Sequence, residues 1–248
     1  MPDLGGRRIA LAGGTGGLGA ATAKLLAAEG ARLVLGFAGN AGRAERVRQE
    51  AGGEILLCRA DITTDQGREA LLDAAPDLYG LVVLVGDPAR GAGEETIRRS
   101  IEVNFLAPAL LARQAAERMR AARARGAIVL AASMQAVHVF ENSTAYAAPK
   151  AALIHAARTL AKECGGPADI RVNVVAPGVT TAGMAEASVR SGKYDRFLEG
   201  GIIPRFGRAE DVARAIRFFL EPDNYITGQV LAIDGGLTLR RDLPPQPK

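Results

Sequence analysis

The sequence contains only two cysteines and two histidines, and this scarcity excludes several kinds of site. Cys58 and Cys164 stand far apart and show no CxxC spacing, so we expect inert thiols rather than a disulfide or a metal centre. His138 and His155 fit no HExxH motif, and no GxSxG sequence marks a hydrolase nucleophile. The sequence therefore predicts neither a bound metal nor acyl-enzyme chemistry.

Long apolar runs are also missing. The longest one, LYGLVVLVG, is too short to cross a bilayer, so we expect no membrane contact. The opening residues MPDLGGRRIALAGG lack the apolar core of a signal peptide, and we therefore expect a cytoplasmic protein. No repeat or linker divides the 248 residues, which predicts one domain over 1–248 with a loose or docked tail at 240–248.

The net charge of +4 comes from arginines scattered along helix-like segments and not from a single basic run. No zinc-finger spacing and no aromatic-basic RNA-binding motif accompanies them. We therefore expect solvated helix faces and no nucleic-acid partner, while an anionic small molecule remains compatible with the charge.

Short β-branched and apolar runs alternate with longer amphipathic ones, which is typical of a parallel sheet covered by helices on both faces. The pattern predicts an α/β protein with a doubly wound Rossmann fold. Seven strands are expected, at 8–12, 32–37, 54–60, 80–85, 127–132, 170–176 and 229–233. Helices are expected near 18–29, 42–51, 64–75, 96–123, 145–164 and 209–220. In such a fold, ligands bind where the carboxyl ends of the strands meet.

A glycine-rich turn, AGGTGGLG, follows the first predicted strand and precedes the first predicted helix. Glycines at this place let backbone N–H groups and the positive end of the helix approach a pyrophosphate. The turn therefore predicts a dinucleotide site, with a merely tight loop as the alternative. Its candidate residues are Gly13, Thr15, Gly17, Leu18 and Gly19.

The loop after the second strand bears on which dinucleotide is bound. Between Glu29 and Glu45 there is no acidic residue that could bind the adenosine ribose and repel a 2′-phosphate. Asn40 and Arg43 lie there instead, and a guanidinium suits a phosphate. The loop therefore favours NADP(H) over NAD(H), although Arg43 could equally be a solvated residue at the start of a helix.

Tyr146 and Lys150 are four residues apart in STAYAAPKAAL, so a helix would place both on one face. Because Pro149 is tolerated only in the first helical turn, the helix should begin near Thr144–Tyr146, with Ser143 or Thr144 as its N-cap. An ammonium ~5 Å from the phenol, at an effective dielectric of ~20, favours the phenolate by about 3 kcal/mol, or roughly two pKa units. We therefore expect Lys150 to lower the pKa of Tyr146.

With these motifs in place, the chain resembles the short-chain dehydrogenase/reductase family over essentially its full length. The glycine turn, Asn104 in IEVNFLAP, Ser133 in AIVLAAS, the YAAPK sequence and VNVVAPG recur in the family's order. IPRFGRAEDVARAIRFFL and YITGQVLAIDGG resemble the C-terminal third of 3-oxoacyl-(acyl-carrier-protein) reductases. The resemblance implies an oxidoreductase that uses NADP(H) to reduce a ketone or 3-oxoacyl-type carbonyl to a secondary alcohol.

The resemblance also implies roles for four catalytic candidates. Tyr146 would protonate the carbonyl oxygen as hydride arrives, and Ser133 would donate a hydrogen bond to the same oxygen. Lys150 would hold the nicotinamide ribose, and Asn104 would position a water between Lys150 and solvent. Plain structural readings stay open for two of them: Ser133 as a turn residue at a strand end, and Asn104 as a helical residue bonded to its own backbone.

Further cofactor contacts are carried over from the family in the same way. Asp61 would bind the adenine amine, or else cap the next helix, a role that Thr63 or Thr64 could also fill. Thr180 or Thr181 would bind the nicotinamide carboxamide, and of these Thr181 is our candidate. The remaining candidates are Ile62, Gly86, Pro177, Gly178 and Val179.

The chain departs from the family at several positions. Val83, Leu84 and Val85 stand where Asn-Asn-Ala is usual, so side-chain bonds that brace the central sheet are expected to be lost. Gly16 replaces an arginine that is common in NADP-dependent members, and Ala182 replaces a frequent threonine.

Residues 181–205 are rich in glycine and small side chains, which predicts a mobile lid over the substrate. The lid would close a partly apolar pocket together with Gln135, Val137, Phe140 and Met184. An acyl-carrier protein would need a basic rim, for which the candidates are Arg123, Arg125 and Arg171.

Family members are commonly tetramers, so the resemblance implies a homotetramer built on the helices at 96–123 and 145–164 and on the final strand, with a dimer as second choice. Two other functions stay open. One is an NAD-dependent alcohol or sugar dehydrogenase of the same family, and the other is a sensor or scaffold that binds the dinucleotide without turnover.

Overall fold

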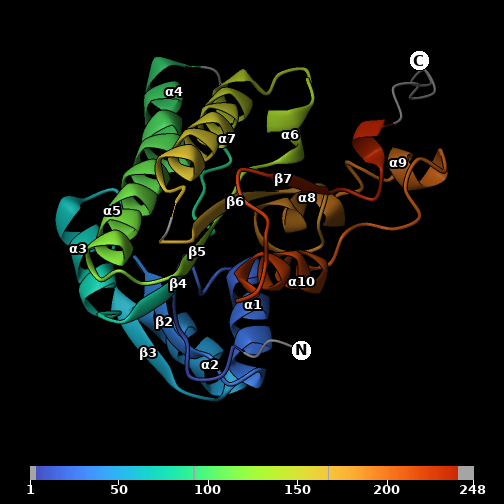
Figure 1. Ribbon diagram of the computed structural model, residues 1–248. Coiled ribbons are helices and arrows are strands. Elements are labelled where there is room, and N and C mark those ends of the chain that lie inside the picture. The colour runs from blue at the N-terminus through green and yellow to red at the C-terminus, as the bar shows by residue number, and fades with distance from the viewer. Residues whose placement is uncertain (1–3, 92, 167, 240–248) are drawn as a thin grey trace.

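A seven-stranded parallel sheet in the order β3-β2-β1-β4-β5-β6-β7 forms the centre of the computed structural model, which describes residues 4–91, 93–166 and 168–239 (Figure 1). The predicted α/β fold is confirmed, although β4 lies two residues earlier than expected. The predicted tail at 240–248 lies outside the described residues. The strands are β1 (Arg8–Ala12), β2 (Arg32–Phe37), β3 (Ile55–Arg59), β4 (Leu78–Val83), β5 (Gly126–Ala131), β6 (Ile170–Pro177) and β7 (Val230–Ile233).

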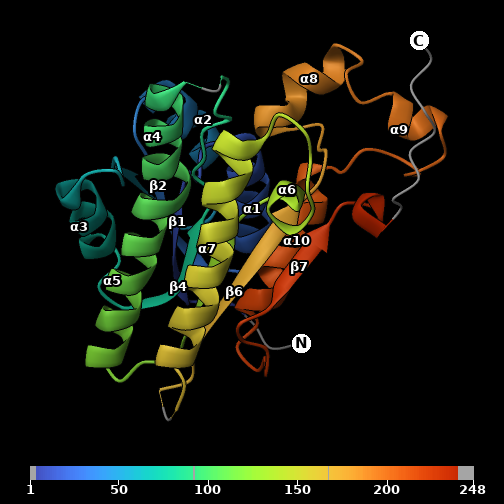
Figure 2. The same cartoon turned by 90° about the horizontal axis from the view of Figure 1, so that it is seen from above.

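Helices cover both faces of the sheet (Figures 1 and 2). On one face α1 (Gly17–Ala28), α2 (Ala41–Ala51) and α10 (Ala209–Leu220) bury apolar residues against the strands. On the other face α3 (Asp65–Asp73), α5 (Ala107–Ala121) and α7 (Thr144–Glu163) do the same. Every residue of β4 and β5 is buried, which explains why these strands read as continuous apolar runs.

The long helix predicted at 96–123 is interrupted. It consists of α4 (Glu94–Ile101), a π-helical turn η1 (Glu102–Leu106) and α5. A π-turn accommodates one extra residue within an otherwise α-helical segment, and such turns are frequent at functional sites. The apolar pattern continues through this turn, so the pattern alone gave no sign of it.

Helix α7 begins at Thr144, as predicted, with Ser143 in the N-cap position. However, Ser143 makes no side-chain cap, because its hydroxyl donates to the Phe140 carbonyl (2.6 Å). We had expected Pro149 in the first turn of this helix. It is instead the sixth helical residue and lies past that turn. Lacking an N–H, Pro149 leaves the Ala145 carbonyl without the usual helical donor.

The predicted lid segment contains short helices: η2 (Gly183–Ala185), α8 (Glu186–Arg190) and α9 (Arg196–Glu199). Helices α8 and α9 stand apart from the two helical layers (Figure 2). Phe197, Ile202 and Ile203 anchor the segment in a small apolar cluster with residues of other elements. The lid is thus more ordered than its small-residue composition indicated, and its mobility stays a prediction. Two more short helices are α6 (Met134–Val137) and η3 (Leu237–Leu239).

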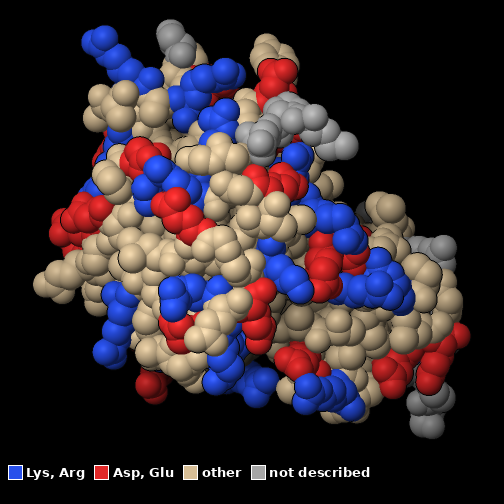
Figure 3. All heavy atoms as spheres, turned by 90° about the horizontal axis from the view of Figure 1, so that it is seen from below, with Lys and Arg blue, Asp and Glu red and all other residues tan. Residues whose placement is uncertain are grey.

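Basic and acidic side chains lie beside each other on the face shown in Figure 3, in keeping with ion pairs such as Arg48–Glu45 and Arg113–Glu117. Within the described residues, no helix is long and apolar enough to cross a membrane, and no group of three or more His, Cys, Asp or Glu side chains could hold a metal ion. Both cysteines are free thiols.

Two of the three arginines considered for a basic rim lie away from the candidate site. Arg171 is only 4% exposed and donates to the Tyr79 hydroxyl (3.1 Å) and the Glu221 carbonyl (2.9 Å). Arg125 pairs with Asp169 (2.6 Å). Arg171 and Arg125 lie at the amino ends of β6 and β5, whereas the catalytic candidates follow the carboxyl ends of strands. These arginines therefore lie at the wrong edge of the sheet to surround the active site.

Candidate active site

The loops after β4, β5 and β6 meet at the carboxyl edge of the sheet and line a cavity of about 520 Å³. Ser133, Tyr146 and Lys150 share its wall with the turn 177–180 that follows β6. Three of the four catalytic candidates are thus brought together, as the sequence predicted. Asn104 is fully buried and does not line the cavity.

Tyr146 lies in the first turn of α7, and Ser133 lies at the N-cap of α6, directly after β5. Ser133 Oγ accepts the Gln135 N–H (3.2 Å) and is also hydrogen-bonded with the Tyr146 phenol. Burial raises the pKa of the Tyr146 phenol above its ordinary value, the bond with Ser133 lowers it in part, and Tyr194 raises it further. At neutral pH this phenol is therefore protonated.

Lys150 is almost completely buried, at 2% exposure, and burial lowers its pKa to about 8. Its Nζ donates to the carbonyls of Ala131 (2.9 Å) and Val85 (3.3 Å). Two of its three donors are thereby used and one remains.

The expectation that Lys150 lowers the Tyr146 pKa is wrong for this structure, where burial dominates and the net shift is upward. Burial of the ring disfavours the charged phenolate, and this effect outweighs the attraction to a nearby ammonium.

Asn104 lies in the π-turn η1, and its side chain holds the loop after β4. Its Oδ1 accepts the Asp87 N–H (3.0 Å), while its Nδ2 donates to the Asp87 carbonyl (2.9 Å) and to Ser100 Oγ (2.8 Å). These hydrogen bonds join Asn104 to residues 87 and 100 and not to its own backbone. Its proposed link to a water near Lys150 stays a prediction, and Asp87, the residue it clamps, was missed in the sequence.

The glycine turn fits a dinucleotide by its geometry. Gly13 has a φ of +76°, and a Cβ added at Gly19 would lie 2.3 Å from the Gly13 carbonyl oxygen. Helix α1 has no side-chain cap at Gly16, so no capping side chain competes with a phosphate for its first N–H groups. Thr15 lies within this turn, and Leu18 lines the large cavity.

The loop after β2 places Asn40 at the N-cap of α2, where its Oδ1 accepts the Arg43 N–H (2.8 Å). The Arg43 side chain is exposed. Arg59, which the sequence analysis missed, ends β3 opposite Phe37, and its Nε donates to the Ala38 carbonyl (3.4 Å). Aligning β2 with β3 would have identified Arg59, because the two strand ends are neighbours. Two arginines therefore flank the place expected for the adenosine ribose.

Asp61 is not the cap of α3. Its Oδ1 accepts the backbone N–H (3.0 Å) and the hydroxyl (2.7 Å) of Thr63, while Thr64 caps the helix by accepting the Gly67 N–H (3.0 Å). The neighbouring Ile62 is buried. The position of Asp61 after β3 is compatible with the predicted adenine contact, which stays a prediction.

Pro177, Gly178 and Val179 line the cavity as expected, but the next position differs. Thr180 lines the cavity, whereas Thr181 is exposed and its N–H donates to the Gly207 carbonyl (2.9 Å). Of the two threonines, Thr180 therefore lies at the cavity, and the contact with the nicotinamide carboxamide stays a prediction. The turn bends here because Thr180 forms a β-bridge with Gly207, which the sequence does not reveal.

Gly86 lies close to two of the catalytic candidates. A Cβ added there would lie 3.2 Å from Asn104 Oδ1 and 3.5 Å from Lys150 Nζ. Before it, Leu84 and Val85 line the cavity and Val83 lies in the core. Of the expected pocket residues, Gln135 and Met184 line the cavity, while Val137 is partly exposed and Phe140 packs on the apolar cluster of the lid.

Comparison with known proteins identifies the family. A family model described as Enoyl-(Acyl carrier protein) reductase matches residues 12–238. The chain therefore belongs to the short-chain dehydrogenase/reductase family, whose members are NAD(P)-dependent oxidoreductases.

Individual relatives cover nearly the whole chain. It is 35% identical over 254 residues to a cis-4-hydroxycyclohexanecarboxylate dehydrogenase of Sinomonas cyclohexanicum, covering 96% of this chain and 99% of that protein. It is 33% identical to a 3-oxoacyl-(acyl-carrier-protein) reductase of Mus musculus, with coverages of 93% and 97%. Among solved structures, a short-chain type dehydrogenase/reductase from Mycobacterium ulcerans has a TM-score of 0.88 at 28% identity, with coverages of 96% and 92%.

Proposed function

We propose that this protein is an NADP(H)-dependent oxidoreductase that reduces a ketone or 3-oxoacyl-type carbonyl to a secondary alcohol, with Tyr146 as the general acid. The observation that carries the proposal is the single cavity lined by Ser133, Tyr146 and Lys150 beside the turn after β6. A dinucleotide bound along the glycine turn would reach this cavity through Leu18, which lines it. When bound, the dinucleotide supplies the hydride.

The residues of the chain account for the proton. Tyr146 is partly buried, and its raised pKa keeps the phenol protonated, as a proton donor to a developing alkoxide requires. Ser133 lies within hydrogen-bond reach of the same hydroxyl and would stabilise the oxygen that receives the proton. The remaining donor of Lys150 is available to a ribose hydroxyl or to the phenolate that forms after transfer.

Arg43 and Arg59 support the preference for NADP(H). Both are exposed at the edge where β2 and β3 end, and neither has a carboxylate partner within the described part of the chain. A 2′-phosphate would meet two guanidinium groups there and no acidic residue of the loop 38–44. Values of kcat/KM measured with NADPH and with NADH test this preference, which equal values would contradict.

The substrate and the direction of the reaction are open to a direct screen. Relatives are named for oxidising a hydroxy acid and for reducing 3-oxoacyl groups, so both directions need to be assayed. A panel of ketones with NADPH, and of secondary alcohols with NADP⁺, would be followed by nicotinamide absorbance. Binding without turnover across the panel would favour the sensor or scaffold function.

Tyr146→Phe tests the mechanism, because it removes the proton and leaves the ring. We expect turnover to fall by ~10²–10⁴-fold while NADPH binding, measured by fluorescence titration, stays nearly unchanged. Tyr225→Phe is the matched control, because Tyr225 is fully exposed and does not line the cavity. A Tyr146→Phe enzyme that works at the wild-type rate would remove Tyr146 from the mechanism.

We also propose a homotetramer in the cytoplasm. Apolar side chains are exposed on two separate surfaces, with Ile97, Ile101 and Leu106 along α4 and η1, and Phe218 and Leu231 near β7. Two such surfaces suit an assembly with two kinds of contact. Free thiols at both cysteines are usual in a reducing compartment. Light scattering of the purified protein would give the mass of the assembly directly.

A further inference from the structure

The turn after β4 departs from ordinary backbone geometry. Its sequence is Asp87-Pro88-Ala89-Arg90, and Ala89 has a φ of +48°, a conformation that side chains other than glycine rarely adopt. Such strain persists only where surrounding bonds impose it, and it is concentrated at functional sites. The turn follows β4, at the position where the chain departs from its family's usual sequence.

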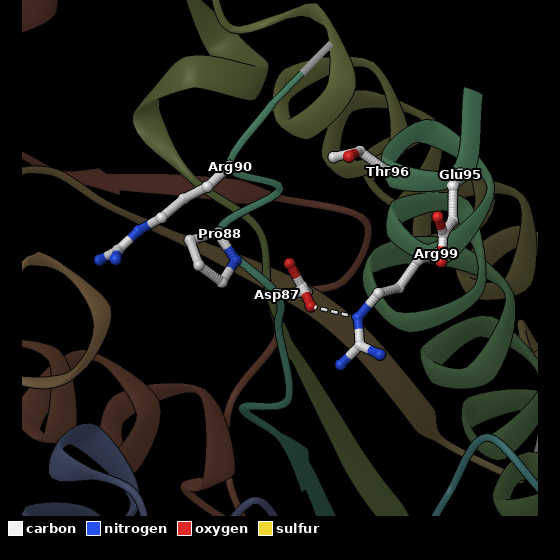
Figure 4. Close-up of a pocket in the computed structure, with 6 residues that line it drawn as sticks. All are labelled: Asp87, Pro88, Arg90, Glu95, Thr96 and Arg99. Carbon is white, nitrogen blue, oxygen red and sulfur yellow. Dashed lines mark hydrogen bonds and ion pairs between the residues drawn. The ribbon is translucent and has the colours of Figure 1, made fainter. Parts of the chain in front are cut away.

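Three sets of bonds impose this shape. The Asp87 carboxylate accepts the Ala89 N–H (2.8 Å) and the Arg99 Nε–H (2.7 Å), as Figure 4 shows for the pair with Arg99. The Arg99 bond lowers the pKa of Asp87, which therefore stays ionised at neutral pH. Asn104 grips the peptide N–H and carbonyl of Asp87 from the other side. The turn is thus held by Arg99 of α4, by Asn104 of η1 and by the bond between Asp87 and Ala89 within the turn.

The consequence of this fixed turn is the placement of Arg90. Its side chain points away from the Asp87–Arg99 pair and lies on the wall shared by the large cavity and a smaller hollow of about 320 Å³ (Figure 4). Among the described residues it has no hydrogen-bond or ion-pair partner, unlike Arg98 and Arg99 on the neighbouring helix. An unpaired guanidinium at a cavity wall is well suited to bind an anion.

A second cation lies in the same cavity on the lid side. Lys193 lines it, with its Nζ 5.5 Å from the centre of the Tyr194 ring. Besides Lys150 at the base, the only other charged group among the described lining residues is the carboxylate of Glu141. Arg90 and Lys193 together carry one positive charge more than Glu141 offsets. This single surplus charge matches a carboxylate better than a dianionic phosphate.

We propose that Arg90, assisted by Lys193, binds a carboxylate of the substrate, so that the protein acts on oxo acids and their hydroxy acids. The ketone or alcohol end lies at Tyr146 and the carboxylate end at Arg90. Arg90 is then a substrate-binding residue, and Asp87, Ala89 and Asn104 position it. This inference rests on the oxidoreductase function proposed above.

The experiment uses substrate pairs that differ in charge and by one methyl group. Levulinate and a cyclohexanone carboxylate would each be assayed beside the methyl ester, with NADPH and NADH. For the wild type we expect kcat/KM to be ~10–100-fold higher for the acids. Arg90→Gln should abolish most of this difference by raising KM for the acids, with kcat and the values for the esters nearly unchanged. Lys193→Gln should act in the same direction with a smaller effect.

Arg98→Gln is the matched control, because Arg98 is solvent-exposed on α4 and pairs with Glu94 on the same helix. It should leave all values unchanged, and Arg90→Lys should restore part of the preference for acids. Wild-type enzyme that uses esters as well as acids would overturn the proposal, and so would Arg90→Gln affecting both equally. A preference for a hydroxyketone phosphate over the acids would also overturn the proposal, because the anion bound at Arg90 would then be a phosphate.

Failure of the oxidoreductase function itself remains distinguishable. If neither acids nor esters are turned over, the proposed function fails for these compounds, and calorimetry of cyclohexanecarboxylate with the NADPH-loaded protein tests Arg90 separately. Binding to the wild type that is lost in Arg90→Gln would support the carboxylate site. No binding to the wild type, or equal binding to both proteins, would overturn it.

Discussion

Two turns leave the carboxyl edge of the sheet side by side, after the paired strands β1 and β4, and they are built in opposite ways. The turn after β1 takes its shape from missing side chains, because a Cβ at Gly19 would collide with the backbone of Gly13. The turn after β4 takes its shape from side chains, since Asp87 and Asn104 bond its peptide groups. The first leaves room for a ligand's phosphates, whereas the second presents a charged side chain.

Gly19→Ala should have the largest effect, because it destroys the first kind of turn. Its Cβ would lie 2.3 Å from the Gly13 carbonyl oxygen and 2.6 Å from the Gly14 carbonyl carbon, and both are backbone atoms. We expect the dissociation constant of NADPH to rise ~100-fold or more and the free energy of unfolding to fall by ~3 kcal/mol. Fluorescence titration and chemical denaturation measure the two effects.

Gly16→Ala is the control within the same turn. The Cβ at Gly16 would lie 3.4 Å from its nearest neighbour, an ordinary contact, and the backbone there is extended. Binding of NADPH should stay within about twofold of the wild type. Equal losses in the two variants would show that the turn tolerates no side chain at any position, whatever the local space.

Lys150→Met tests the group that braces the second turn from inside, through the Val85 carbonyl. The folded-state pKa of about 8 lies below the ordinary value of 10.5, so between these pH values the unfolded chain binds more protons than the folded one. The free energy of unfolding of the wild type should therefore rise relative to Lys150→Met from pH 8 to pH 10.5, by up to ~3 kcal/mol.

Urea denaturation of both proteins across this pH range gives the difference. Lys162→Met serves as control, because Lys162 is exposed on the same helix. A flat difference for Lys150→Met would mean that the folded protein does not disfavour the buried ammonium.

Ala89→Gly should have the smallest effect and the opposite sign. Relief of the left-handed conformation at φ +48° outweighs the extra freedom of glycine in the unfolded chain, so unfolding should cost ~1 kcal/mol more. Ala70→Gly, at an exposed site in the middle of α3, should instead destabilise by ~1 kcal/mol. Thermal denaturation would compare the two, and a loss of stability in both would mean that Ala89 is not strained.

The same comparison explains what the sequence could predict. The glycine turn was predictable because a local pattern of residues determines it, and Tyr146 with Lys150 because helical spacing does. The turn at Asp87 could not be predicted, because its partners Arg99 and Asn104 lie 12 and 17 residues further on. Asn104 also lies in the π-turn that interrupts the helix.

Other differences have the same origin in packing. Thr180 rather than Thr181 lines the cavity because Thr180 forms a bridge to Gly207. Arg171 is buried, where it donates a hydrogen bond to Tyr79. The direction of the Tyr146 pKa shift follows from burial of the ring. None of these contacts lies within one stretch of sequence, so periodicity and spacing give no access to them.

The side chain at position 90 makes none of the bonds that shape its own turn. Its identity can therefore vary while the scaffold and the proton-transfer residues stay constant. Saturation mutagenesis at this one codon would offer protein engineers a compact route to new selectivities, and natural drift there would diversify related enzymes without refolding them.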